Sequence, residues 1–161
     1  MQVVTSTRPV KTLPTGEATA GTTPSVDRMQ VVFDTSVLLA DPGSWEEWED
    51  VDIVLPVTVI EELDAAKSRI DDAGAAARRV VRRLERLRTD SGGDLRKPVA
   101  LGNGATLRVE LNGLRLEELR SHGLRTDRND NRILAAALGL RDSDYQVTLV
   151  SADVNLRVKA A

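Results

Sequence analysis

The chain has 161 residues, 41% of them hydrophobic, and carries a formal net charge of −3 at pH 7. This length suits one domain with a substantial core and is short for two. Cysteine is absent, which excludes disulfides and thiolate metal ligands, so any metal ion must be held by oxygen. The charge argues against nucleic-acid binding through overall positive charge, and no apolar run approaches the roughly 18 residues of a membrane helix. We therefore expect a soluble, cytoplasmic protein with no membrane segment.

The first 28 residues differ in composition from the rest of the chain. They contain seven Thr and three Pro, with isolated apolar residues that show no sustained period, and this composition is typical of a disordered tail. The folded domain is expected over residues 29–161. The tetrapeptide MQVV occurs at 1–4 and again at 29–32, but a single short repeat does not indicate a repeat architecture.

Short β-branched runs alternate with helical patterns along this domain. Buried strands are expected at 30–33, 52–55 and 146–150, and a half-exposed strand at 106–111. Helices are expected at 56–67, 72–88 and 127–138, the last one stopped by Gly139. Strands and helices that alternate in this way predict an α/β fold, specifically a three-layer α/β/α sandwich with a mostly parallel central sheet.

Four carboxylates fall at one edge of this predicted sheet. Asp34 directly follows the first strand, and Asp153 follows the last strand after two further residues. Asp130 lies in the opening turns of the third helix, and Glu62 lies about two turns into the helix after the second strand. Open α/β sheets bind ligands at the carboxyl ends of their strands. Because like charges at close range repel one another, we expect a divalent cation between these acids.

The donors decide which ion this site would prefer. Sites built only from oxygen select hard ions, so Mg²⁺ or Mn²⁺ is favoured over Zn²⁺. One or two such ions lower the pKa of a bound water and polarise a phosphodiester. The donor set therefore predicts metal-dependent hydrolysis of nucleic acid, with water as the nucleophile.

Four segments of the sequence resemble the PIN half of PhoH-type proteins. They are VFDTSVLLADP, LPVTVIEELDAAK, DNRILAAAL and LVSADVNLRVKA, and together they cover most of residues 30–160. The resemblance places the metal-binding, catalytic acids on Asp34, Glu62, Asp130 and Asp153, and the hydroxyls that line the site on Thr35 or Ser36 and on Ser151. It implies a PIN-like α/β/α sandwich, Mg²⁺ or Mn²⁺, and endonuclease cleavage of single-stranded RNA.

The sequence also departs from the PhoH-type pattern. Those proteins continue into an ATPase half, whereas this sequence stops at Ala161 and contains no G-x-x-x-x-G-K-[ST] phosphate loop. We therefore assign no ATPase activity to the chain. Besides single-stranded RNA, the resemblance leaves an ATPase domain, an antitoxin-like protein and a second copy of the chain as expected kinds of partner.

Each candidate acid also has a purely structural interpretation. Asp34 could cap the short helix expected after it, and Asp153 could stabilise a turn at the end of its strand. Glu61 competes with its neighbour Glu62 for the inward position. Asp127 could cap the third helix or support the site from outside the set of metal ligands.

Several basic residues are candidates for contact with RNA phosphates. Arg132, Arg157 and Lys159 lie close in sequence to the predicted acids, and we expect them to be the best placed. The many arginines of the predicted helix at 72–88 are interpreted as an ordinary solvated face opposite an apolar stripe.

Three functions compete at this point. The first hypothesis is a metal-dependent endoribonuclease. The alternative is an RNA-binding or regulatory module of a PhoH-type ATPase with little nuclease activity of its own. A phosphatase with an aspartyl nucleophile at Asp34 ranks low, because Ser36 stands where that chemistry needs a second acid.

Overall fold

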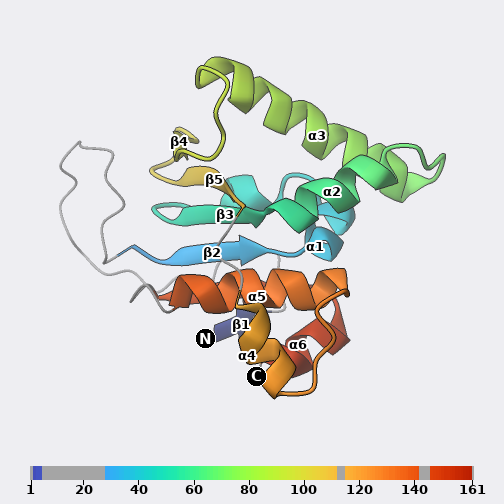
Figure 1. Ribbon diagram of the computed structural model, residues 1–161. Helices are drawn as coiled ribbons and strands as arrows, with labels where there is room; N and C mark the ends of the chain where they lie inside the picture. Colours follow the sequence, from blue (N-terminus) through green and yellow to red (C-terminus); the bar gives the residue numbers. More distant parts are fainter. Residues whose placement is uncertain (1, 5–27, 112–114, 142–145, 161) are drawn as a thin grey trace.

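The computed structural model describes residues 2–4, 28–111, 115–141 and 146–160 (Figure 1). Within them, six strands form one sheet in the order β1-β6-β2-β3-β5-β4. The strands are β1 (Gln2–Val4), β2 (Gln30–Phe33), β3 (Asp52–Pro56), β4 (Val99–Ala100), β5 (Thr106–Glu110) and β6 (Val147–Val150). Neighbouring strands run parallel, except that β4 is antiparallel to β5. The predicted α/β fold with a mostly parallel sheet is confirmed.

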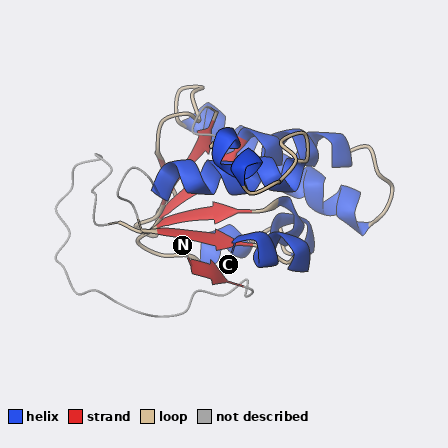
Figure 2. Ribbon diagram, turned by 60° about the horizontal axis from the view of Figure 1, so that its bottom comes forward, coloured by secondary structure: helices blue, strands red, loops and turns tan. Residues whose placement is uncertain are grey.

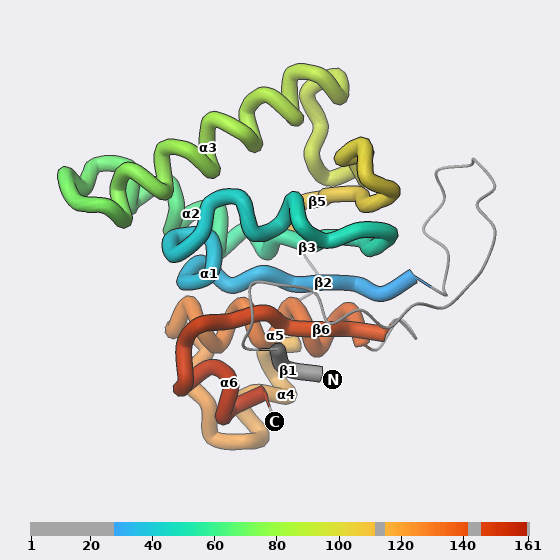
Figure 3. Tube along the Cα trace, turned by 180° about the vertical axis from the view of Figure 1, so that it is seen from behind, coloured from blue at the N-terminus to red at the C-terminus, as the bar shows by residue number. Residues whose placement is uncertain are grey.

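Helices flank this sheet, and Figure 2 shows them on both sides of the strands. They are α1 (Thr35–Ala40), the 3₁₀ helix η1 (Ser44–Glu47), α2 (Val57–Ala66), α3 (Asp72–Asp90), α4 (Leu116–Ser121), α5 (Asn129–Arg141) and α6 (Val154–Ala160). In Figure 3, α2 and α3 lie toward β3 and β5, whereas α4, α5 and α6 lie toward β6 and β1. None of the helices in the described ranges is long and apolar enough to cross a membrane.

The predicted strands and the three longer helices are found within a few residues of their expected bounds. The prediction that Gly139 stops the third helix is wrong, because α5 continues through it to Arg141. Leu140 is buried, so the apolar face of α5 extends past Gly139. Burial of this side chain stabilises the last residues of the helix. The short helices α4 and α6 were not among the predicted elements.

The predicted tail at residues 1–28 needs a correction at its start. Residues 2–4 form β1, which pairs in parallel with β6, Gln2 lying opposite Thr148. On its other side, β6 pairs with β2, which carries the second copy of the same QVV sequence. The edge strand β1 therefore has the same three-residue sequence as the start of β2, and both strands pair with β6. Residues 5–27 of the predicted tail lie outside the described part of the chain.

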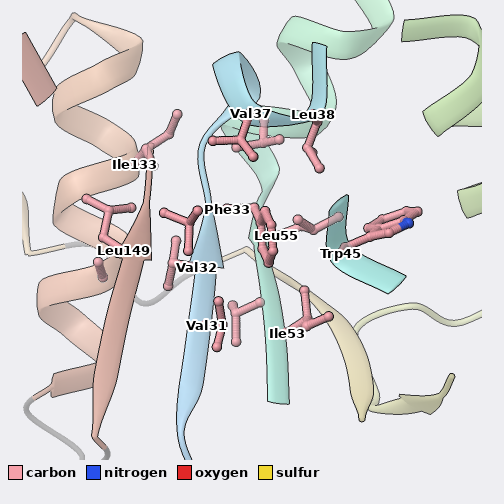
Figure 4. Packing of buried hydrophobic residues seen from close by; sticks show 14 of the residues in the cluster. Val31, Val32, Phe33, Val37, Leu38, Trp45, Ile53, Leu55, Ile133 and Leu149 are labelled. Atoms are coloured by element: carbon pink, nitrogen blue, oxygen red, sulfur yellow. The ribbon is translucent and has the colours of Figure 1, made fainter. Parts of the chain in front are cut away.

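The core lies on both sides of the central strands. Val31, Val32 and Phe33 of β2 have no exposed surface, since side chains from neighbouring elements cover both faces of the strand. Figure 4 shows Ile133 of α5 beside Leu149 of β6, on one side of this packed layer. A strand that is buried on both faces reads in sequence as a continuous apolar run, which is why β2 was predicted correctly.

The parallel arrangement brings the carboxyl ends of β2, β3 and β6 to one edge of the sheet. Phe33 at the end of β2 pairs with Val150 at the end of β6, and the next backbone N–H, that of Asp34, donates to the carbonyl oxygen of Val150 at 3.0 Å. Figure 3 shows α1 and α6 leaving the sheet at this same end. Residues that follow β2 and β6 are therefore held side by side.

Candidate functional site

Asp34 is the most buried acid of the edge. It links β2 to α1 and is 5% exposed. Although it occupies the N-cap position of α1, its side chain accepts no capping hydrogen bond from that helix. Instead, Oδ2 accepts hydrogen bonds from Ser36 Oγ and, at 2.7 Å, from Ser151 Oγ. The structural interpretation of Asp34 as a helix cap therefore does not explain where its carboxylate lies.

The electrostatics of Asp34 also point to a functional position. Burial raises the pKa of this carboxyl group above its ordinary value, and the negative charge of Glu62 raises it further. The hydrogen bonds from Ser36 and Ser151 act in the opposite direction but do not cancel the increase. A carboxylate that is kept in a site unfavourable to its own charge, close to a second acid, is a candidate for cation binding.

The two serines form a relay from the backbone to Asp34. Ser36 Oγ accepts a hydrogen bond of 3.1 Å from the N–H of Ala152, and Ser151 Oγ accepts one of 3.0 Å from the N–H of Asp153. Each hydroxyl therefore receives from the turn after β6 and donates to Asp34. This network fixes the orientation of the carboxylate and binds the end of β6 to the start of α1.

Glu62 of α2 is held by two donors from different elements. Thr35 Oγ1, in α1, donates to Oε2, and Asn129 Nδ2, in α5, donates to Oε1 at 2.9 Å. The neighbouring Glu61 is 57% exposed and lies 3.8 Å from Arg132. Helical phase therefore turns Glu62 toward Thr35 and Asn129 and Glu61 toward solvent, and the role of Glu62 as a metal ligand stays a prediction.

Asp130 lies in the first turn of α5 and faces α6. Its Oδ1 accepts from the N–H of Asn131 at 2.9 Å, and its Oδ2 accepts from Lys159 Nζ at 2.6 Å. Burial acts to raise the pKa of Asp130, but the hydrogen bonds from Lys159 and from the Asn131 N–H outweigh it, so the pKa lies below its ordinary value. Asp130 is thus ionised and already paired with a cation.

Asp153 is exposed and lies just before α6. Its Oδ1 accepts a hydrogen bond of 2.8 Å from the N–H of Asn155, which is the turn-stabilising role considered as its structural interpretation. At the same time its N–H donates to Ser151, so the residue belongs to the network around Asp34.

The structure does not gather the four acids into one cluster. Within the described ranges, no group of three or more His, Cys, Asp or Glu side chains is close enough together to hold one ion. Asp34 and Glu62 are brought together, whereas Asp130 is bound to Lys159 and Asp153 faces solvent. The assignment of all four acids as catalytic metal ligands stays a prediction.

The other predicted site residues divide in the same way. Asp127 is 62% exposed and pairs with Arg125 Nη2 at 2.5 Å, away from the network. Arg132 forms an ion pair with Glu61, so its guanidinium already has an acidic partner. The Nε atom of Arg157 is buried without a hydrogen-bond partner in the described part of the chain. The predicted contacts of these basic residues with RNA remain untested.

Sequence reasoning missed the amides that flank Asp130. Asn129 orients Glu62, and Asn131 accepts from Lys159 Nζ at 2.8 Å while its own Nδ2 donates to the carbonyl oxygen of Arg125 at 2.6 Å. The signal available in the sequence was the run RNDNR, in which two amides surround the predicted acid. Amides at such spacing are natural partners for carboxylates that must keep a fixed orientation.

The donor chemistry at this edge fits a hard divalent ion. The side chains around Asp34 and Glu62 offer carboxylate, hydroxyl and amide oxygens, which Mg²⁺ and Mn²⁺ prefer. Burial, the larger cause, and the negative charge of Glu62 both raise the pKa of Asp34 and so disfavour its ionised form. A cation near Asp34 and Glu62 would favour that form.

The fold and the site define an α/β protein with paired acids at the carboxyl edge of a parallel sheet. The sequence profile described as "PIN domain" matches residues 31–161, and the chain belongs to the PIN domain family. PIN domains are generally nucleases and are usually metal-dependent.

The chain is similar to several curated proteins named Protein PhoH2. It is 45% identical over 130 residues to that of Thermobispora bispora, covering 81% of this chain and 29% of the relative. It is 40% identical over 135 residues to that of Bacillus subtilis, covering 80% of this chain and 30% of the relative. The chain therefore corresponds to about 30% of the length of these relatives and is a PIN domain of the PhoH2 type.

One solved structure resembles the chain more distantly. It is a domain of a functionally unknown protein from Methanocaldococcus jannaschii, with a TM-score of 0.45 and 17% sequence identity. The match covers 81% of this chain and 83% of that one. At this level the likeness carries no argument about function.

Proposed function

We propose that this PIN domain is a metal-dependent endoribonuclease that hydrolyses phosphodiester bonds of single-stranded RNA. The observation that carries the proposal is the pairing of Asp34 with Glu62 at a buried position, where burial and the second negative charge raise the pKa of Asp34. In the described part of the chain, these two acids accept hydrogen bonds from hydroxyls, an amide and a backbone N–H, all of which are neutral. A divalent ion supplies the positive charge that this arrangement lacks.

In this proposal the ion is held by four acids: Asp34, Glu62, Asp130 and Asp153. When bound, it provides a water of lowered pKa and polarises the phosphodiester. The chain's own contribution is orientation, since Ser36 and Ser151 fix the carboxylate of Asp34 through backbone-anchored hydroxyls. The two donors to Glu62 do the same for the second acid, and such preorganisation is what a metal site on a rigid scaffold needs.

The proposal is tested by cleavage of an end-labelled single-stranded RNA with Mn²⁺, Mg²⁺ or a chelator, beside the Asp34→Asn variant. We expect metal-dependent cutting that the variant loses while its circular dichroism spectrum is unchanged. Cutting retained by Asp34→Asn would remove Asp34 from the mechanism. No cutting under any condition would remove the nuclease assignment for this chain.

A second candidate is an RNA-binding or regulatory module with little nuclease activity of its own. It is favoured by one observation: Asp130 is already neutralised by Lys159, so this edge is not a complete four-acid site. The chain corresponds to about 30% of the PhoH2 relatives, so a longer protein with an ATPase domain is a natural setting for such a role. RNA binding that persists in chelator would support this candidate against the nuclease.

The remaining partners belong to the proposal as well. An antitoxin-like protein or a second copy of the chain would be a means of restraining or assembling a nuclease, and the cytoplasm is the proposed compartment because RNA is its substrate. Size-exclusion chromatography with light scattering would decide whether the chain forms a homo-oligomer.

A further inference from the structure

Lys159 occupies a defined place between α6 and α5. Its ammonium donates to Asp130 Oδ2 at 2.6 Å and to Asn131 Oδ1 at 2.8 Å. The side chains of Lys159 and Asp130 are 18% and 19% exposed, so the pair is largely shielded from water. At such exposure the pair is screened by water and salt less than an ordinary surface salt bridge is.

Both acceptors are fixed independently of Lys159. Asn131 is 2% exposed, and its Nδ2 is bonded to the carbonyl oxygen of Arg125, which directs its Oδ1 toward the ammonium. Asp130 is anchored through Oδ1 to the N–H of Asn131, so its Oδ2 is the oxygen directed at Lys159. The first turn of α5 therefore forms a small cradle for a cation, and Lys159 fills it.

This arrangement distinguishes Asp130 from the other acids of the edge. Asp34, Glu62 and Asp153 accept hydrogen bonds from hydroxyl, amide and backbone N–H donors, which carry no net charge. Asp130 alone among these four is paired with an ammonium in the described residues. A divalent ion that used Asp130 Oδ2 would meet the charge of Lys159 at contact distance.

We propose that Lys159 is a built-in counter-cation of the site. Its ammonium takes the place on Asp130 that a divalent ion needs. The ion therefore binds only when the ammonium of Lys159 has moved away from Asp130. This inference rests on the proposed function, because it takes Asp130 to be a metal ligand. Two cations cannot share one carboxylate oxygen without strong repulsion. The long, flexible stem of lysine allows the ammonium to swing into solvent, which makes it a displaceable occupant. Lys159 thus competes with the divalent ion for Asp130 and lowers the affinity of the site for metal.

The test is direct measurement of Mn²⁺ binding, by calorimetry and by the electron paramagnetic resonance signal of free Mn²⁺, in wild type and in Lys159→Met. We expect Lys159→Met to bind Mn²⁺ at least about tenfold more tightly, because one unit charge at contact distance in a shielded site is worth more than a factor of ten. Lys67→Met is the matched control. Lys67 pairs with Asp64 at 2.5 Å but lies at the exposed end of α2, so its loss changes net charge equally and should leave Mn²⁺ affinity near that of wild type.

The outcomes separate this inference from the proposed function. Equal Mn²⁺ affinity in wild type and Lys159→Met, or weaker affinity in the variant, would overturn the competition and leave the metal site standing. Absence of Mn²⁺ binding in every protein would overturn both. If Lys159→Met does not fold, Lys159→Gln decides the question, since its amide still donates to Asp130 and Asn131 without a charge, and it too should bind Mn²⁺ more tightly than wild type.

Discussion

Ser151 Oγ, at the end of β6, donates a 2.7 Å hydrogen bond to Asp34 Oδ2, at the end of β2, across a sequence separation of 117 residues. Because the hydroxyl of Ser151 also accepts from the N–H of Asp153, the orientation of Asp34 depends on how the last strand ends. The parallel pairing of β2 with β6 therefore holds these residues next to one another at the acidic edge. A site assembled in this way forms only when the two ends of the domain have met.

Asp34→Asn should stabilise the metal-free protein at neutral pH. Burial raises the pKa of Asp34, so the folded state favours its protonated form and is penalised once the group ionises. The stability contributed by this group is fully present below the unfolded pKa and is lost as pH rises through the raised folded pKa. The neutral amide avoids that loss, and we expect a gain of about 1 kcal/mol, or roughly 2–4 °C in Tm.

The measurement is thermal unfolding in chelator as a function of pH. The advantage of Asp34→Asn over wild type should be largest near pH 7 and vanish in acid, where Asp34 is protonated in both states. Asp64→Asn removes a carboxylate whose side chain is 67% exposed and serves as the control, with little effect expected. A variant less stable than wild type at pH 7 would show that the carboxylate is structural.

Thr35→Val should disturb the site without disturbing the core. Thr35 donates through Oγ1 to Glu62 Oε2, and valine has the same shape but no donor, so Glu62 loses one of its two orienting hydrogen bonds. Loss of such a supporting contact typically costs about 10–100-fold in metal affinity or activity. Calorimetry with Mn²⁺ and the RNA cleavage assay provide the two readouts.

The matched variant for this experiment is Thr35→Ser, which keeps the hydroxyl. It should retain Mn²⁺ affinity close to that of wild type, although removal of a methyl group from a 7% exposed residue costs some stability. If the serine and valine variants lose affinity equally, the hydrogen bond to Glu62 does not orient the ligand and the effect arises from packing.

Much of the fold could be predicted because its central strands, β2, β3 and β6, are buried on both faces. Val31, Val32 and Phe33 form a continuous apolar run, and such a run is a strong signal in sequence. The short helix α6 was missed because Leu156 and Ala160 are its only buried residues among those described, which is too few to establish a helical period. β1 was missed because a segment of three residues acquires its structure from the neighbouring β6.

Some features of the site could be predicted from the sequence and others could not. Acids that follow strands could be located, because the carboxyl ends of parallel strands always share an edge. The pairing of Lys159 with Asp130 could not, since it depends on how α6 packs against α5, and this packing leaves no periodic trace in the sequence. The charge state of the edge is therefore a property of tertiary structure.

Gly74→Ala should destabilise the protein, contrary to the usual effect of alanine in a helix. Alanine normally stabilises a helix by about 1 kcal/mol over glycine. Here a Cβ atom on Gly74 would lie 2.0 Å from the carbonyl oxygen of Arg69, so the turn between α2 and α3 would have to move. We expect a loss of about 1–3 kcal/mol by urea unfolding. Ala75→Gly, one residue further along α3, is the control, and its free energy of unfolding should fall only by the ordinary difference in helix propensity between alanine and glycine. If Gly74→Ala were more stable than wild type, the close approach of Gly74 to Arg69 would be contradicted.

Asp127→Ala should leave both cleavage and folding unchanged, whereas Asp130→Asn should abolish metal-dependent cleavage. The two acids are three residues apart and both were candidates for the site, but the structure separates them. Asp127 is 62% exposed, and the pKa of its carboxyl group is lowered by the hydrogen bond from Arg125, which is a surface pair with no contact to Glu62 or Lys159 among the described residues. Asp130 is instead the acid that faces α6.

The measurement is the cleavage rate of each variant in Mn²⁺ with the same RNA, and the two rates should differ by orders of magnitude. Asp127→Ala should stay within about twofold of wild type, because exposed ion pairs contribute little. A similar loss in both variants would mean that the RNA or the ion reaches beyond the edge defined by Asp34 and Glu62, to the loop that carries Asp127.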